Sequence, residues 1–130
     1  MRIVLADNDP RTFSALRILL NCEAALEVVG EVTSTEQLLE LAQSEELDLV
    51  LLDWELRGQP DAGLLDDLRD IHPEARVIAL SGRTESEREA LRAGADAFVS
   101  KAEPASTLME EMTGLGKGDQ AGKLTVRSDR

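Results

Sequence analysis

Four short apolar runs in this chain each end on a polar residue, and this pattern constrains the fold more than any other feature. The runs cover residues 3–6, 49–52, 77–80 and 97–99, and they lead into Asp7, Asp53, Ser81 and Ser100-Lys101. The first three are continuous rather than alternating, as expected for parallel strands that helices cover on both faces. Because ligands of such sheets bind outside the carboxyl ends of the strands, we expect these polar side chains to lie close together.

Segments with helical periodicity alternate with the apolar runs, which predicts five βα units. The expected strands cover residues 2–6, 26–32, 48–53, 76–81 and 96–100, and the expected helices lie within 9–22, 34–42, 64–71, 84–93 and 104–112. Ser34 with Gln37, and Thr84 with Glu87, have the spacing of capping boxes, in which two side chains satisfy free N–H groups at a helix start. The pattern predicts a doubly wound, three-layer α/β fold.

Length and composition favour a single folded domain. The chain has 130 residues, within the usual range of one domain. We expect this domain to cover residues 1–113, followed by a flexible, glycine-rich tail over 114–130. No window reaches the roughly 20 apolar residues that a membrane span needs. We see no signal-peptide pattern, and Cys22 is the only cysteine, so we expect a cytoplasmic protein.

The charge balance restricts the partners. The chain has 26 acidic and 14 basic residues and a net charge of −12. Such a surface repels nucleic acids and anionic membranes, so we expect neither direct DNA binding nor membrane association. It suits a cation, or a protein partner with a basic patch.

The residues at the strand ends match the requirements of phosphoryl transfer, which needs a nucleophile, a divalent cation and fixed positive donors. Asp53 is the natural acceptor, because a carboxylate can form an acyl phosphate. Asp7 and its neighbours are a natural seat for Mg²⁺, which prefers oxygen ligands. Lys101 offers a compact positive charge for a phosphoryl oxygen, and Ser81 offers a hydroxyl donor.

The chain resembles the receiver domains of bacterial two-component response regulators. The residues that carry this resemblance are, in order, Asp7-Asn8-Asp9-Pro10, Asp53, Ser81 and the stretch of residues 93–101. The similarity covers residues 2–113, and its local sequence is closest to receivers attached to helix-turn-helix output domains. The resemblance implies a flavodoxin-like (βα)5 sandwich with strand order 2-1-3-4-5.

The resemblance also implies a phosphorylation switch rather than an enzyme. A histidine kinase, a phosphotransfer protein or a small acyl phosphate would donate a phosphoryl group to Asp53. Mg²⁺ would be held by Asp7, Asn8, Asp53 and the backbone carbonyl of Glu55.

A change at the partner surface would then follow. The phosphoryl group would draw in Ser81, and Phe98, a switch aromatic in the family, would rotate inward. The surface of residues 84–113 would change its affinity for an unidentified downstream protein, and receivers often form homodimers through this surface.

Three sequence features depart from the family pattern or add to it. Asn8 stands where the family usually has an acidic residue, which predicts weak Mg²⁺ binding. Asp9 is a possible second acidic residue, although it can instead cap the first helix. Glu55 and Arg83 lie two positions past the acceptor and Ser81, and they could pair over the site.

Two alternatives stay open. Asn8 also fits a degenerate receiver, which is not phosphorylated and acts only as a protein-interaction module. Asp7-Asn8-Asp9 further fits the Asp-x-Asp motif of haloacid-dehalogenase-like phosphohydrolases, with Asp7 as nucleophile and Asp9 as acid and base. This last alternative leaves Asp53 without a role.

Overall fold

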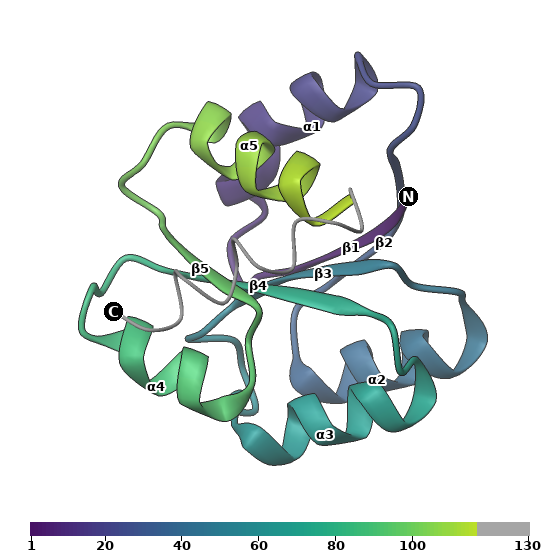
Figure 1. The fold of residues 1–130 in the computed structure, drawn as a ribbon, viewed down its shortest axis with the longest axis vertical. Helices are drawn as coiled ribbons and strands as arrows, with labels where there is room; N and C mark the ends of the chain where they lie inside the picture. The colour runs from purple at the N-terminus through teal and green to yellow at the C-terminus, as the bar shows by residue number, and fades with distance from the viewer. Residues whose placement is uncertain (117–130) are drawn as a thin grey trace.

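The apolar runs form adjacent strands of one parallel sheet (Figure 1). The computed structural model describes residues 1–116. Its strands are β1 (Arg2–Ala6), β2 (Glu27–Val32), β3 (Leu49–Asp53), β4 (Arg76–Ser81) and β5 (Ala97–Ser100). They lie in the order β2-β1-β3-β4-β5. The predicted doubly wound fold and its strand order are therefore confirmed.

Helices cover both faces of the sheet. They are a 3₁₀ turn, η1 (Pro10–Phe13), and the helices α1 (Ser14–Asn21), α2 (Thr35–Ser44), α3 (Ala62–Ile71), α4 (Ser86–Ala93) and α5 (Ala105–Gly116). Figure 1 shows α1 and α5 on one face and α2, α3 and α4 on the other. Parallel crossovers are right-handed, so the change of direction after β2 places α1 on the face opposite to the next three helices.

Two separate cores explain why the central runs are continuously apolar. Successive side chains of a strand point to opposite faces of the sheet. Val4, Ala6, Val50 and Leu52 pack toward α2, α3 and α4, whereas Ile3, Leu5, Leu49 and Leu51 pack toward α1 and α5. All eight are buried. Helices on both faces therefore leave no position within residues 3–6 of β1 or 49–52 of β3 for a solvent-facing polar residue.

The first predicted capping box is formed in part. The Ser34 hydroxyl accepts a hydrogen bond from the Gln37 N–H at 3.1 Å, which caps α2. The Gln37 carbonyl oxygen accepts from the Thr33 N–H at 2.8 Å instead of from Ser34. The side chain of Gln37 thus extends the cap by one residue toward β2.

The second predicted capping box, at Thr84, is wrong. Helix α4 begins at Ser86, and its N-cap residue Glu85 makes no side-chain capping bond within the described residues. The Glu87 N–H donates to the backbone carbonyl of Thr84 at 3.2 Å. A backbone turn therefore satisfies the N–H group that the threonine hydroxyl was expected to satisfy.

Two predicted boundaries also differ from the structure. The first helical segment is divided into η1 and α1 rather than continuous. Helix α5 continues to Gly116, so residues 114–116 of the predicted tail are helical, and residues 117–130 lie outside the described residues. Among residues 1–116, no helix has the length and apolar character needed to cross a bilayer.

Replacing Leu51 tests the core on the α1–α5 face. Leu51 is 0% exposed, so Leu51→Ala should lower the free energy of unfolding by about 2–5 kcal/mol through lost burial and a cavity. Urea unfolding followed by circular dichroism measures this. Ile18 on α1 is 67% exposed, and the control Ile18→Ala should change the value by less than about 0.5 kcal/mol. Equal losses in both variants would contradict this assignment of the core.

Candidate functional site

The sheet brings the predicted polar residues to one edge. Asp7 follows β1, Asp53 ends β3, Ser81 ends β4 and Lys101 follows β5. These four strands are neighbours in the sheet and run parallel, so their carboxyl ends meet. Asp7, Asp53 and Ser81 are all buried, at 5%, 3% and 0% exposure. The convergence expected from the sequence is therefore present.

Lys101 is the charge partner of both aspartates. Its Nζ lies 2.8 Å from Asp7 Oδ2 and 3.2 Å from Asp53 Oδ2. Asp7 Oδ2 is fully buried and accepts no hydrogen bond from residues 1–116, so its contact with Nζ is an ion pair without hydrogen-bond geometry. Removing two carboxylates from water is costly unless a positive group compensates them, and Lys101 supplies that compensation.

The electrostatics of the site show which charges dominate. Burial raises the pKa of Asp53 and the Asp7 charge adds to this, although the Glu55 N–H and Lys101 act in the opposite direction. Burial alone would lower the pKa of Lys101, but Asp7 and Asp53 outweigh it and raise that pKa above its usual value. At neutral pH the lysine is therefore charged, and ionised Asp53 carries a burial penalty.

The Glu55 side chain also belongs to the site, through a contact with Ser81 that the sequence did not predict. Its carboxylate accepts a hydrogen bond from the Ser81 hydroxyl, with distances of 2.8 and 3.0 Å to its two oxygens. The sequence left open whether Glu55 pairs with Arg83 or both are solvated surface charges, and in the structure Arg83 Nε instead faces Glu85 at 3.4 Å. The position of Glu55, two residues after Asp53, was the sequence signal that its side chain lies near the site. The sequence could not decide whether its carboxylate would accept from Ser81 or from Arg83.

Asn8 connects the end of β1 to the loop after β3. Its Nδ2 donates to the backbone carbonyl of Glu55 at 2.9 Å, and its Oδ1 accepts from the Arg57 N–H at 3.0 Å. The two expected cation ligands besides the aspartates are thus hydrogen-bonded to each other.

The aspartates nonetheless fit a divalent cation. Asp7 Oδ2 is a buried carboxylate oxygen without a hydrogen bond from the described residues, and Asp53 Oδ2 shares its counter-ion. No group of three His, Cys, Asp or Glu side chains suited to a metal occurs within residues 1–116. Two carboxylates suit Mg²⁺, which usually keeps several water ligands.

The Asp9 carboxylate is bound to Arg11 and not to this cluster, although the Asp9 N–H donates to Asp7 Oδ1 at 2.7 Å. Asp9 Oδ1 accepts from the Arg11 N–H at 2.9 Å and caps η1, and its carboxylate pairs with the Arg11 guanidinium at 3.0 Å. The hydrogen bonds from Arg11 lower the pKa of Asp9. Of the two roles considered for Asp9, the structure shows the helix cap.

Two aromatic residues near the site are both buried. Phe98 is 7% exposed and belongs to the core that includes Ala90 of α4. In this structure the ring of Phe98 is therefore already buried in the core, which is the position that the expected inward rotation would give it. Trp54 is 5% exposed, and its Nε1 donates to the Glu89 carboxylate on α4 at 3.1 Å. The residue next to Asp53 is thus hydrogen-bonded directly to α4.

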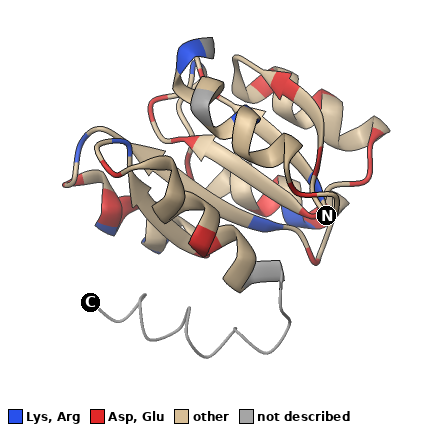
Figure 2. Ribbon diagram, turned by 90° about the horizontal axis from the view of Figure 1, so that it is seen from above, with Lys and Arg blue, Asp and Glu red and all other residues tan. Residues whose placement is uncertain are grey.

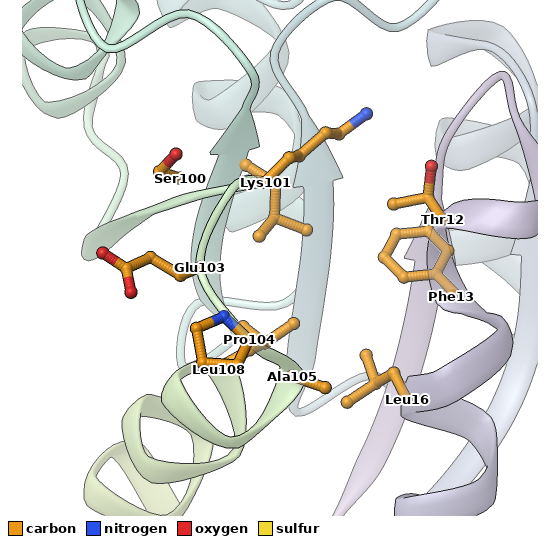
Figure 3. Close-up of a pocket in the computed structure, with 10 residues that line it drawn as sticks. Thr12, Phe13, Leu16, Ser100, Lys101, Glu103, Pro104, Ala105 and Leu108 are labelled. Atoms are coloured by element: carbon orange, nitrogen blue, oxygen red, sulfur yellow. The ribbon is translucent and has the colours of Figure 1, made fainter.

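A pocket of about 210 Å³ adjoins the site between α1 and α5. Figure 3 shows Thr12, Phe13 and Leu16 on one side of it and Glu103, Pro104 and Ala105 on the other. Lys101 also lines this pocket, whereas neither aspartate does. Lys101 therefore lies between an ionic site and a largely apolar hollow.

The raised pKa of Asp53 predicts a pH-dependent effect on stability. Because the folded state binds the Asp53 proton more tightly than the unfolded state does, ionised Asp53 destabilises the fold. The penalty is absent below the ordinary aspartate pKa of 3.8, which applies to the unfolded chain, and complete above the raised pKa of the folded state. Asp53→Asn should therefore unfold at a higher temperature than the unchanged protein at pH 7, and calorimetry should find this advantage reduced near pH 4. An advantage independent of pH would contradict this.

Comparison with known proteins gives related sequences and folds. The *Escherichia coli* K12 nitrate/nitrite response regulator protein NarL is 34% identical over 101 residues, which cover 76% of this chain and 47% of that protein. The Fimbriae Z protein of *Salmonella typhimurium* is 31% identical over 101 residues, or 76% of this chain and 48% of that protein. The chain thus spans about half the length of these curated relatives.

Solved structures share the fold. A CheY-like receiver domain protein from *Methanospirillum hungatei* superposes with a TM-score of 0.74 at 23% identity, covering 95% of each chain. A LuxR-family DNA-binding response regulator from *Staphylococcus aureus* gives 0.77 at 19% identity, covering 89% of this chain and 98% of that one. The family model of the response regulator receiver domain matches residues 3–113, and the chain therefore belongs to this family.

Proposed function

We propose that this chain is a phosphorylation-dependent signalling switch in which Asp53 accepts the phosphoryl group. The observation that supports this most is the position of Lys101 Nζ, which lies within 3.2 Å of the acceptor carboxylate and 2.8 Å of Asp7. A nucleophile, a fixed cation and a second carboxylate thus meet at one edge of the sheet. The donor is a histidine kinase, a phosphotransfer protein or a small acyl phosphate.

The transfer forms one bond and breaks another. An oxygen of ionised Asp53 attacks phosphorus, and the bond from phosphorus to the donor nitrogen or oxygen breaks. The donor atom keeps the electron pair, and a donor imidazole is then reprotonated from water. Lys101 exchanges part of its contact with Asp53 for a phosphoryl oxygen, which offsets the added negative charge. Ser81 offers its hydroxyl to another oxygen.

A divalent cation would be held by Asp7 and Asp53, together with the Glu55 carbonyl and Asn8 once their mutual hydrogen bond opens. When bound, Mg²⁺ neutralises charge on the transferred group. Opening this hydrogen bond has a cost, and Asn8 brings no negative charge, so the proposed affinity is weak.

The proposed output surface is residues 84–113. The hydrogen bond from Trp54 to Glu89 gives the site a direct contact with α4, so a change beside Asp53 can shift that helix. Figure 2 shows acidic residues on helices and loops throughout the ribbon. With a net charge of −12, the surface suits a downstream protein with a basic patch, and pairing of two copies is a further proposed use of it.

A degenerate receiver is the second candidate, and one observation favours it. Glu55 and Asn8 close the site with internal hydrogen bonds, at 2.9 Å between Asn8 Nδ2 and the Glu55 carbonyl. A protein in this state could act by contact alone. The phosphohydrolase alternative loses its support, because Asp9 is bound to Arg11 and the whole matched region belongs to the receiver family.

Mass spectrometry tests the acceptor. Incubation with Mg²⁺ and acetyl phosphate should add one phosphoryl group, located on Asp53 after borohydride reduction and peptide mapping. Asp53→Asn should lose the adduct, whereas the control Asp9→Asn should retain it, because the Asp9 carboxylate is bound to Arg11 and its backbone N–H is unchanged by the substitution. A modified Asp53→Asn protein, or an unmodified natural chain, would count against the switch.

Fluorescence of Trp54, the only tryptophan, measures cation binding. Asn8→Asp should tighten Mg²⁺ binding roughly tenfold, which corresponds to about 1.4 kcal/mol, because it adds a charge and removes the donor to Glu55. Titration of both proteins with MgCl₂ compares the dissociation constants. Equal constants would show that position 8 is not a ligand, and a flat signal in both proteins, confirmed by calorimetry, would favour the degenerate receiver.

A further inference from the structure

Glu55 engages the candidate site with three different polar groups. Its N–H donates to Asp53 Oδ1 at 2.9 Å, and its carbonyl accepts from Asn8 Nδ2 at 2.9 Å. Its carboxylate accepts from the Ser81 hydroxyl at 2.8 Å. Each group therefore contacts a residue that phosphoryl transfer would use, and the side-chain contact is the one that a substitution can remove selectively.

The only hydrogen that the Ser81 hydroxyl can donate is already used. A serine hydroxyl has a single hydrogen to donate, and here that hydrogen faces the Glu55 carboxylate. The Ser81 oxygen also accepts from the Arg83 N–H at 2.9 Å, and the residue is 0% exposed. Ser81 therefore cannot donate to a phosphoryl oxygen until the carboxylate of Glu55 leaves.

The carboxylate of Glu55 has the chemistry of the group it would exclude. It presents two anionic oxygens to Ser81, as a phosphoryl group on Asp53 would. Two anions cannot share one donor in a buried site without strong repulsion. Glu55 is only partly buried, so its side chain can turn into solvent when the competing anion is bound.

We propose that Glu55 is a positioning residue that competes with the phosphoryl group for Ser81 and thereby holds the receiver in its unphosphorylated state. This inference rests on the proposed function. Phosphorylation then replaces an internal carboxylate by a covalently attached anion, and the energy needed to displace Glu55 lowers the fraction of the active state.

Beryllofluoride binding tests the competition. With saturating Mg²⁺ and Trp54 fluorescence as the readout, Glu55→Ala should bind beryllofluoride about tenfold more tightly than the unchanged chain, because no charge-assisted hydrogen bond must be broken. Glu55→Gln keeps an acceptor but removes the charge, so its affinity should lie between the two. Glu85→Ala is the matched control, since it removes an exposed carboxylate from the same edge and should leave the affinity unchanged.

A double-mutant cycle tests the contact itself without any ligand. Urea unfolding of Glu55→Ala, Ser81→Ala and the double variant should reveal a coupling of at least about threefold in the unfolding equilibrium constant. Absence of coupling, or equal beryllofluoride affinity with and without the Glu55 carboxylate, would overturn the competition while leaving the switch intact. Coupling together with no beryllofluoride binding by any variant would overturn the proposed function, and the competition with it.

Discussion

The ion pairs of Lys101 with Asp7 and Asp53 are the interaction on which the site depends. Two carboxylates stand at the ends of neighbouring central strands and are almost fully removed from water. One ammonium group lies between them, at 2.8 and 3.2 Å. Loss of Lys101 would leave both carboxylates uncompensated, and breaking a buried ion pair in this way usually costs about 3–5 kcal/mol. The Lys101 ammonium, which stabilises this edge of the sheet, is therefore also the group suited to bind a further anion there.

Internal hydrogen bonds occupy the polar groups around Asp53. Asn8 holds the loop after β3, Glu55 accepts from the hydroxyl of Ser81, and Phe98 is part of the core. Under the proposed function, a phosphoryl group on Asp53 would exchange these contacts for its own. The balance between the two sets of contacts would be a population equilibrium, so small changes at Glu55 or Asn8 would shift the proposed switch without altering the fold.

Much of the fold followed from periodicity, whereas choices among side-chain partners did not. The runs at 3–6, 49–52 and 77–80 had the continuous character of buried parallel strands, and they form β1, β3 and β4. Thr84 had the spacing of a cap, but a backbone turn satisfies the N–H of Glu87 instead. Such details depend on differences of an ångström that spacing along the chain does not encode.

The sequence by itself determined the parallel sheet and the edge at which Asp7, Asp53, Ser81 and Lys101 meet, because burial on both faces dictates apolar runs and parallel strands end together. Only the tertiary structure decided which groups pair there. Residues far apart in the chain form hydrogen bonds there, such as Ser81 with Glu55 and Trp54 with Glu89. The choice of partner is settled by distance and orientation in the folded chain, which no pattern along the sequence contains.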